Sequence, residues 1–422
     1  MRARARAVIT ALGALGLTLT GAASARAVDI GGFAQVNYAA RISGAPCGAA
    51  GPCDFLLGEE RLQLKLEGTS EQGRSGFAAK VDLFQDAVEN RAGVEVREAF
   101  VNLTGKHAAL RVGRQIVTWG AGDLVFVNDV FPKDWAALFT GRPMEYLKVG
   151  SGALKVDLHP GAFDAEIVVL PIFQPDRFPT ANRFILPDPF PPGLPRLEEQ
   201  KDRSLANAEL AGRISHYLSD WGLSLYACRT FFRTPAMAVD DPAAPSSVHI
   251  FYPRLNTYGV SATGSFMGGV ASFEGGYLDS REDRHGTNPA IENSMLKGLA
   301  GYSYPLWRDA TLGLQGYLER TLDYGAYRAT LPAGFPARDE RRWLATVRLT
   351  QLMWNQTLTG SLFAFWGVTD HDGYLIPSAR YAATDNVLVE IGGNVFVARD
   401  SHTMFGALDR NDNVYATVRY SF

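Results

Sequence analysis

The chain has 422 residues, a length that would allow two or three soluble domains. Its 43 Gly, 24 Phe and 16 Tyr, with only 20% charged residues, instead describe a chain rich in turns and in strand-forming residues. The formal net charge of −3 excludes a polycation built to bind nucleic acid, so we expect no nucleic-acid partner.

The first 27 residues have the pattern of a secretory signal peptide. Three arginines precede an apolar run from 7 to about 23, and Ala25-Arg26-Ala27 forms a small-x-small cleavage site. A membrane anchor is the alternative, but the run is short and the cleavage pattern follows it directly. We therefore expect an exported mature chain of residues 28–422. No later stretch reaches the roughly 18 apolar residues that a spanning helix needs, which leaves a soluble exported protein or a membrane β-barrel.

Three cysteines fit an exported chain. Cys47 and Cys53 lie in a loop rich in Gly, Pro and Ala, close enough to form a small disulfide ring in an oxidising compartment. A metal site is a weak alternative, because no His and no second cysteine pair lies nearby, so we expect no metal. Cys228 falls within a strand pattern, as a lone buried or lipid-side thiol.

Apolar and polar residues alternate in segments of about ten residues, the pattern of a membrane β-barrel. The clearest example is the stretch from Arg61 to Glu67, where charged or amide side chains interleave with leucines. A sheet of a soluble protein, with one face in contact with water, would explain one such strand. It explains a whole succession of them less well. Eighteen segments show strand patterns, near 30–40, 58–69, 75–84, 94–104, 107–115, 147–157, 162–170, 205–216, 221–233, 249–264, 267–279, 292–304, 309–321, 340–353, 356–368, 373–384, 386–399 and 411–422.

The connections between these segments alternate between short and long. Short periplasmic turns and longer external loops, with an even strand count, are how outer-membrane barrels are threaded. The connection at 369–372 is short for an external loop, and sixteen strands remain the alternative. We predict an all-β, transmembrane, antiparallel up-and-down β-barrel of about 18 strands.

In such a barrel, the residues that alternate with the lipid-facing residues along each strand point into the lumen. Charge in hydrocarbon is expensive, so inward charges need water or mutual pairing. For each of them, stabilising pairing across the wall is as good an interpretation as a role in conduction. The residues predicted to face the lumen include Arg61, Lys65, Lys80, Asp82, Glu209, Arg213, Arg348 and Arg419.

The long connection at 116–146 is unusually apolar for a surface loop. Phe126, Phe131 and Trp135 need burial, which inside a barrel means packing on the inner wall. We expect this loop to fold into the lumen, with a loop that caps the rim as the alternative. A ring of fixed charges at a narrowing filters ions, but acids and bases are both present, so the charge preference stays open. The predicted constriction residues are Arg114, Asp123, Asp129, Lys133, Asp134, Arg142 and Glu145.

The connection at 171–203 combines eight prolines with several basic residues. As an external loop it could cover the pore or contact lipopolysaccharide phosphates, although a solvated loop with no specific partner is the favoured interpretation.

Two segments carry a family resemblance. Residues 97–105, with the sequence REAFVNLTG, and residues 110–115, LRVGRQ, resemble the strand-turn-strand pattern of Gram-negative general porins. A final strand that ends in Phe422 looks like the signal by which outer-membrane proteins reach their assembly machinery. The resemblance implies a barrel in the outer membrane of a Gram-negative bacterium, in contact with its lipid and lipopolysaccharide. Trp119-Gly120 and the segment 129–135 depart from the classical porins and indicate a different branch of large barrels. A homo-oligomer is one possibility, but the classical trimer and the classical pore lining are not implied for this branch.

The function that follows is passive diffusion of small hydrophilic solutes through a water-filled lumen. The alternative is an accessory barrel that scaffolds an export or electron-transfer partner. No Gly-x-Ser-x-Gly elbow and no His-Glu-x-x-His helix occurs, so we do not expect an enzyme, and no cofactor is implied. His371-Asp372 and His402 near Asp400 leave a lipid-acting enzyme as a minor alternative.

Overall fold

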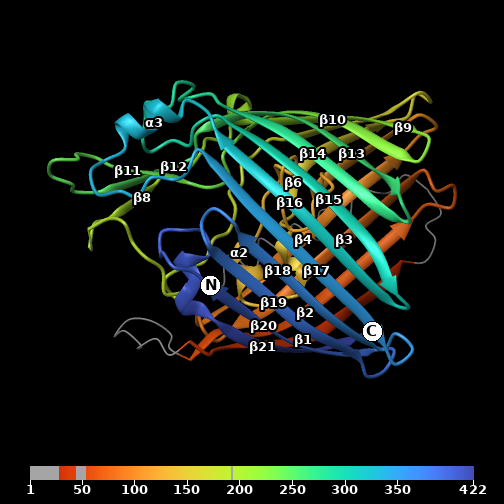
Figure 1. The fold of residues 1–422 in the computed structure, drawn as a ribbon. Coiled ribbons are helices and arrows are strands. Elements are labelled where there is room, and N and C mark those ends of the chain that lie inside the picture. The colour runs from red at the N-terminus through yellow and green to blue at the C-terminus, as the bar shows by residue number, and fades with distance from the viewer. Residues whose placement is uncertain (1–27, 44–53, 192) are drawn as a thin grey trace, which may run out of the picture.

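The computed structural model describes residues 28–43, 54–191 and 193–422, and in them eighteen antiparallel strands form one barrel (Figure 1). The barrel closes because β1 pairs with both β2 and β21. The predicted all-β barrel of eighteen strands is confirmed. Its strands are β1 (Asp29–Arg41), β2 (Phe55–Thr69), β3 (Ser75–Asp86), β4 (Arg91–Thr104), β5 (Ala108–Gln115), β6 (Ser151–Leu158), β7 (Asp164–Leu170), β9 (Glu209–Leu218), β10 (Trp221–Phe231), β13 (Arg254–Phe266), β14 (Gly269–Ser280), β15 (Met295–Trp307), β16 (Ala310–Thr321), β17 (Arg341–Met353), β18 (Leu358–Gly367), β19 (Asp372–Ala382), β20 (Val387–Val397) and β21 (Asn413–Ser421).

Most predicted strands differ from the observed ones by a few residues at their ends, and in two of them the difference changes which element is present. The segment 249–264 is broken at Tyr252-Pro253, because a proline cannot donate a ladder hydrogen bond, and only its second part, β13, belongs to the barrel. The first part, β12 (Val248–Phe251), pairs with β8 (Arg196–Glu198) and β11 (Ala236–Val239) in a separate three-stranded sheet. The segment 205–216 begins with the 3₁₀ turn η2 (Leu205–Asn207) before β9 starts.

The helical elements are short and belong to the long connections. They are α2 (Trp135–Phe139), α3 (Tyr324–Thr330), η1 (Met144–Leu147) and η3 (Gly406–Asn411), besides η2. In Figure 1 the small sheet and α3 lie together at one end of the barrel. Among the described residues, no helix has the length and apolar character needed to cross a membrane.

The outer face of the barrel is apolar and the inner face is polar. Along β21, Val414, Ala416 and Val418 are exposed, whereas the alternate residues Asn413 and Thr417 are buried inside. Leu210, Leu225, Leu314 and Val347 are likewise exposed on other strands. A water-soluble protein would not show so continuous an apolar belt, which is the surface that a lipid environment requires.

A β-bulge at Arg97 changes which residues of β4 face inward. Lys80 pairs with Glu98 and Val81 pairs with Val96, so Arg97 is the extra residue. On one side of the bulge Val96 is exposed, and beyond it Val101 is exposed, which shifts the alternation by one. Arg97 and Glu98 therefore both point into the barrel, near the long connection that follows β5.

Candidate pore constriction

The connection from Ile116 to Gly150 lies inside the barrel and is attached to strands around its circumference. On one side, Trp119 donates to Glu166 of β7, and the backbone N–H of Asp123 donates to Gln315 of β16 at 2.7 Å. On the other side, Asn37 of β1 donates to the carbonyl of Gly141, and Tyr146 donates to Asp82 of β3 at 3.0 Å. A segment bound to β7, β16, β1 and β3 at once crosses the lumen and narrows it.

The apolar residues of this loop pack against the inner wall. Phe139 lies against Tyr374 and Phe396, with ring centroids 5.5 and 5.7 Å apart. Trp119 and Phe131 form a second cluster, with ring centroids 5.0 Å apart, against β7 and β10. Buried Cys228 belongs to this second cluster, on the inner face of β10. Burial of this many rings explains how a loop can hold one position inside a wide barrel.

Three of the predicted constriction residues are buried inside the loop itself. Asp129 is paired with Lys133 and Lys148, and Lys133 also donates to the backbone carbonyls of Asp129 and Phe131. Asp134 caps the N-terminus of α2 by accepting from the N–H of Ala137 at 2.8 Å. Burial lowers the pKa of Lys133, and the charge of Asp129 opposes that shift. These side chains fix the shape of the loop. Asp129 and Lys133 are enclosed within it, whereas Asp134 also borders a lumen cavity.

Two other predicted residues meet the lumen wall as half-exposed ion pairs. Asp123 lies 2.7 Å from Arg348 of β17, and Glu145 lies 2.7 Å from Arg419 of β21. The exposed fractions of the Asp123 and Glu145 side chains are 43% and 45%. These charges are in contact with water within the barrel.

Arg142 and Arg114 border a cavity of about 580 Å³ on the long-loop side of the inserted loop, next to β2–β5. Arg142 pairs with Glu59, and the Nε of Arg114 donates to the carbonyl of Val96. Among the ion pairs of the described residues, none includes Arg114 or Arg91. The basic residues of the lining are Arg61, Arg91, Arg114, Arg142, Arg177 and Arg183, and the acidic ones are Asp86, Glu89, Glu95 and Asp134. The cavity therefore has an excess of positive charge.

Sequence reasoning missed Arg177 and Arg183 as residues of this cavity. Arg177 pairs with Glu95 at 2.7 Å, and Arg183 pairs with Asp86 and Glu89. Part of the proline-rich connection thus reaches into the barrel mouth, unlike the solvated loop that the sequence favoured. The basic residues near prolines were the only available signal, because local pattern does not show which wall a loop contacts.

The residues predicted to face the lumen lie on the inner wall, where they form ion pairs. Lys65 pairs with Glu67, Lys80 with Glu98, and Arg213 with Glu166. Glu209 accepts from Arg233 at 2.6 Å. Arg61 and Asp82 are paired at 2.6 Å and almost fully buried. Pairing of this kind removes the cost of inward charge, as well as much of its effect on solutes.

Further cavities lie on the short-turn side of the inserted loop. One of about 190 Å³ includes Asp123 and Arg348, and another of about 340 Å³ includes Arg213 and His216. The lumen therefore has polar, accessible space on both sides of the loop. In the described part of the chain, no group of three or more His, Cys, Asp or Glu is placed to hold a metal ion. Cys47 and Cys53 lie outside the described residues.

Comparison with known proteins gives a likeness of fold. No protein-family model and no curated relative matches the chain. The structure is similar to OccAB1 of Acinetobacter baumannii, with a TM-score of 0.54 and 11% sequence identity over 95% of this chain and 98% of that one. It is also similar to OccK11 (OpdR) of Pseudomonas aeruginosa, with a TM-score of 0.53 and 9% identity over 94% and 96% of the two chains. These matches confirm the porin-type barrel that the sequence resemblance predicted, as a fold.

Proposed function

We propose that the chain is a passive channel for small hydrophilic solutes in the outer membrane of a Gram-negative bacterium. The observation that carries this proposal is a loop that crosses the lumen while charged cavities remain on both of its sides. A barrel of about 16 to 18 strands is wide enough for an aqueous channel, and an inserted loop then sets the size limit. The apolar outer belt supports the membrane location.

Within this proposal, charge selection falls to the accessible residues. Arg91 and Arg114 attract anions into the cavity near β2–β5, and Arg142, paired with Glu59, lies on its border. The pairs Asp123–Arg348 and Glu145–Arg419 border the narrow region. Asp129, Lys133 and Asp134 hold the loop in place. Phe422 is exposed at the end of the strand that closes the barrel, which supports a role in recognition by the assembly machinery.

Single-channel conductance in a planar bilayer tests the proposal. Detergent-purified, folded full-length protein is expected to give stable steps in KCl. Replacing residues 120–142 with a short Gly-Ser linker is expected to enlarge the steps about two- to threefold, since the lumen then approaches its full width. A matched variant lacking residues 241–246, in the connection between β11 and β12, is expected to conduct like the full-length chain. Silence from folded full-length protein would overturn the proposal, and steps that appear only after the loop is removed would indicate a plugged barrel.

Acidification is expected to raise the permeability of the channel to anions relative to cations. Burial raises the pKa of Asp123, and Arg348 opposes that shift only in part. The carboxylate therefore takes up its proton at a higher pH than an ordinary aspartate, and it leaves the charge of Arg348 unbalanced. Reversal potentials in a KCl gradient, measured from pH 7 to pH 4, should show the change beginning above the normal aspartate range. The variant Asp123→Asn should be anion-preferring already at pH 7 and should lack this early change.

A further inference from the structure

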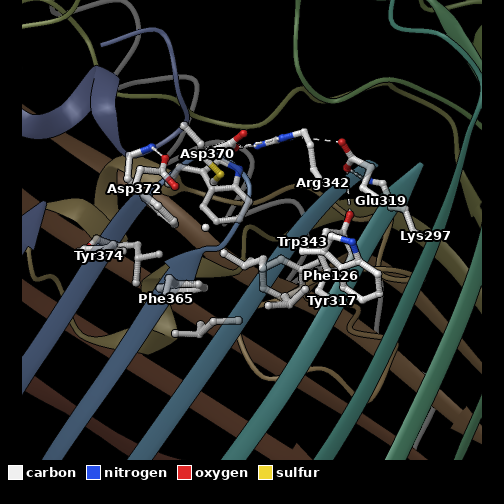
Figure 2. Close-up of a pocket in the computed structure, with 18 of the residues that line it drawn as sticks. Phe126, Lys297, Tyr317, Glu319, Arg342, Trp343, Phe365, Asp370, Asp372 and Tyr374 are labelled. Atoms are coloured by element: carbon white, nitrogen blue, oxygen red, sulfur yellow. Dashed lines mark hydrogen bonds and ion pairs between the residues drawn. The ribbon is translucent and has the colours of Figure 1, made fainter. Parts of the chain in front are cut away.

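A second cavity lies against another part of the wall and differs from the arginine-lined one. It has a volume of about 230 Å³ and lies between the inserted loop and the long-loop ends of β15–β19 (Figure 2). This exceeds the roughly 150 Å³ of a dry cavity that accepts benzene. The cavity opens toward the lumen, and a concave apolar surface in contact with water favours the binding of an apolar group.

The walls of this cavity are aromatic. Phe365 and Tyr374 are stacked, with ring centroids 5.6 Å apart and planes inclined by 5°, and Phe405 packs against both. The inserted loop contributes Phe126 and Trp135 from the facing side. Offset and edge-on contacts with such rings favour a planar apolar group over a hydrated ion.

The rim of the cavity carries an ordered row of charges. Figure 2 shows Arg342 between Glu319 and Asp370, at 3.2 and 2.6 Å, and Lys297 lies 3.7 Å from Glu319. Each cation of the row is thus already matched by a carboxylate. The row as a whole therefore does not attract an anion strongly.

Asp372 adds a carboxylate that this row does not balance. It lines the cavity at the start of β19, is only 1% exposed, and accepts a hydrogen bond from the N–H of Phe405 at 2.9 Å. No ion pair among the described residues includes it. A buried carboxylate without a counter-ion is costly, and an ammonium group would relieve that cost.

We propose that this cavity is a binding subsite for amphipathic amines, with an aromatic or branched apolar group between the rings and the ammonium group beside Asp372. The subsite deepens the proposed channel function by naming a class of solute, and it rests on that function for transport. Binding itself needs no conduction. The cavity faces the long-loop side of the inserted loop, so a solute would occupy it before reaching the constriction.

Isothermal titration calorimetry of the folded full-length protein in a non-ionic detergent tests the subsite. The probes are phenethylammonium, phenylacetate with the same ring and opposite charge, and ethylammonium without the ring. Phenethylammonium is expected to bind about tenfold more tightly than either of the others. Only this probe has both a ring to pack between the aromatic walls and an ammonium group to pair with the carboxylate of Asp372. Equal or tighter binding of phenylacetate would overturn the assignment of charge, and equal binding of ethylammonium would overturn the role of the rings.

Two variants locate the binding site. Asp372→Asn keeps an acceptor for the N–H of Phe405 and is expected to weaken phenethylammonium binding about tenfold. Leu344 of β17 also lines the cavity, and the larger side chain of Leu344→Trp fills it and should abolish binding. Asp157→Asn, on the inner wall near the short turns, is the matched control and should bind as the unchanged protein does. If both cavity variants fold and still bind phenethylammonium normally, the cavity is not the site.

Conductance separates the subsite from the channel function. In a planar bilayer, phenethylammonium is expected to cause brief blockages that the Leu344→Trp variant lacks. Silence of the folded protein together with normal calorimetric binding would refute the channel and leave the subsite standing. Stable conductance without specific binding would refute the subsite alone.

Discussion

Replacement of Glu274 with alanine is expected to free the inserted loop and to change a steady channel into one with larger, fluctuating steps. Glu274 lies on the inner face of β14 and is 5% exposed. Its carboxylate accepts four hydrogen bonds from the loop: from the N–H groups of Ala121, Gly122 and Asn128, and from the side-chain amide of Asn128 at 2.9 Å. No other side chain of the described wall has as many recorded bonds to this loop.

The expected loss of stability follows from these bonds. A hydrogen bond to a charged acceptor contributes about 1.5 to 3 kcal/mol, and a buried donor left without a partner costs about 1 to 3 kcal/mol. Lumen water will replace part of what is lost, so we expect the free energy of unfolding to fall by about 2 to 4 kcal/mol. The aromatic contacts of Phe139 at the other end of the loop remain, which is why the loop should fluctuate and not leave the lumen.

The conservative variant Glu274→Gln provides the control. Its amide oxygen still accepts from two of the N–H groups, so the conductance should stay closer to that of the unchanged protein. Single-channel noise and denaturant unfolding of the detergent-folded barrel measure the two effects. Steps of unchanged size and steadiness in Glu274→Ala would show that the aromatic contacts alone hold the loop.

The barrel could be predicted from sequence because its information is local. The alternation of apolar and polar residues with a period of two shows which residues face the lipid and which face the lumen. The lengths of successive connections indicate on which side of the membrane each connection lies. The same local rule fails at 249–264, because β12 and β13 have equally good strand patterns. Only the partner of each strand distinguishes them. The partners of β12 are β11, which lies in the same connection, and β8, which lies in the preceding long connection.

The loop at 116–146 shows the same limit for side chains. Its apolar content was enough to predict contact with the inner wall, since rings such as those of Phe131 and Trp135 must be buried. The roles of its charges depend on neighbours that the sequence does not show. Asp129 and Lys133 satisfy each other within the loop, whereas Asp123 meets Arg348 from a strand more than two hundred residues away. The sequence therefore predicts which charged residues the loop contains, but it does not distinguish those that hold the loop in place from those that face water.

The cavity beside β15–β19 could not be predicted for a related reason. Its parts come from the inserted loop, from five strands and from the connection before η3. Each aromatic residue, taken alone, has the pattern of an ordinary core residue. Only their arrangement leaves a space between them.

Replacement of Arg61 with alanine is expected to destabilise the barrel more than the loss of any exposed lumen charge. Arg61 is 5% exposed, pairs with Glu59 at 2.9 Å and with Asp82 at 2.6 Å, and lies over the ring of Tyr146 at 4.6 Å. Its removal leaves Asp82, which is fully buried, without a cation. Breaking a buried pair in this way costs about 3 to 5 kcal/mol, mainly because the remaining charge is uncompensated.

Lys65, four residues along the same strand and on the same face, is the matched control. Its ion pair with Glu67 is 2.9 Å long, but both side chains are 42% exposed. The variant Lys65→Ala should therefore change the free energy of unfolding by no more than about 1 kcal/mol. Denaturant unfolding of the folded barrel compares the two variants directly, and equal losses would contradict the distinction between buried and exposed lumen charge.

A double variant identifies the source of the loss. If the penalty is the unpaired carboxylate, Arg61→Ala combined with Asp82→Asn should be more stable than Arg61→Ala alone, because the amide carries no charge. If the penalty is lost packing on Tyr146, the second substitution should restore nothing. Because Tyr146 belongs to the inserted loop, conductance of the same variants also shows whether this buried pair keeps the constriction in place.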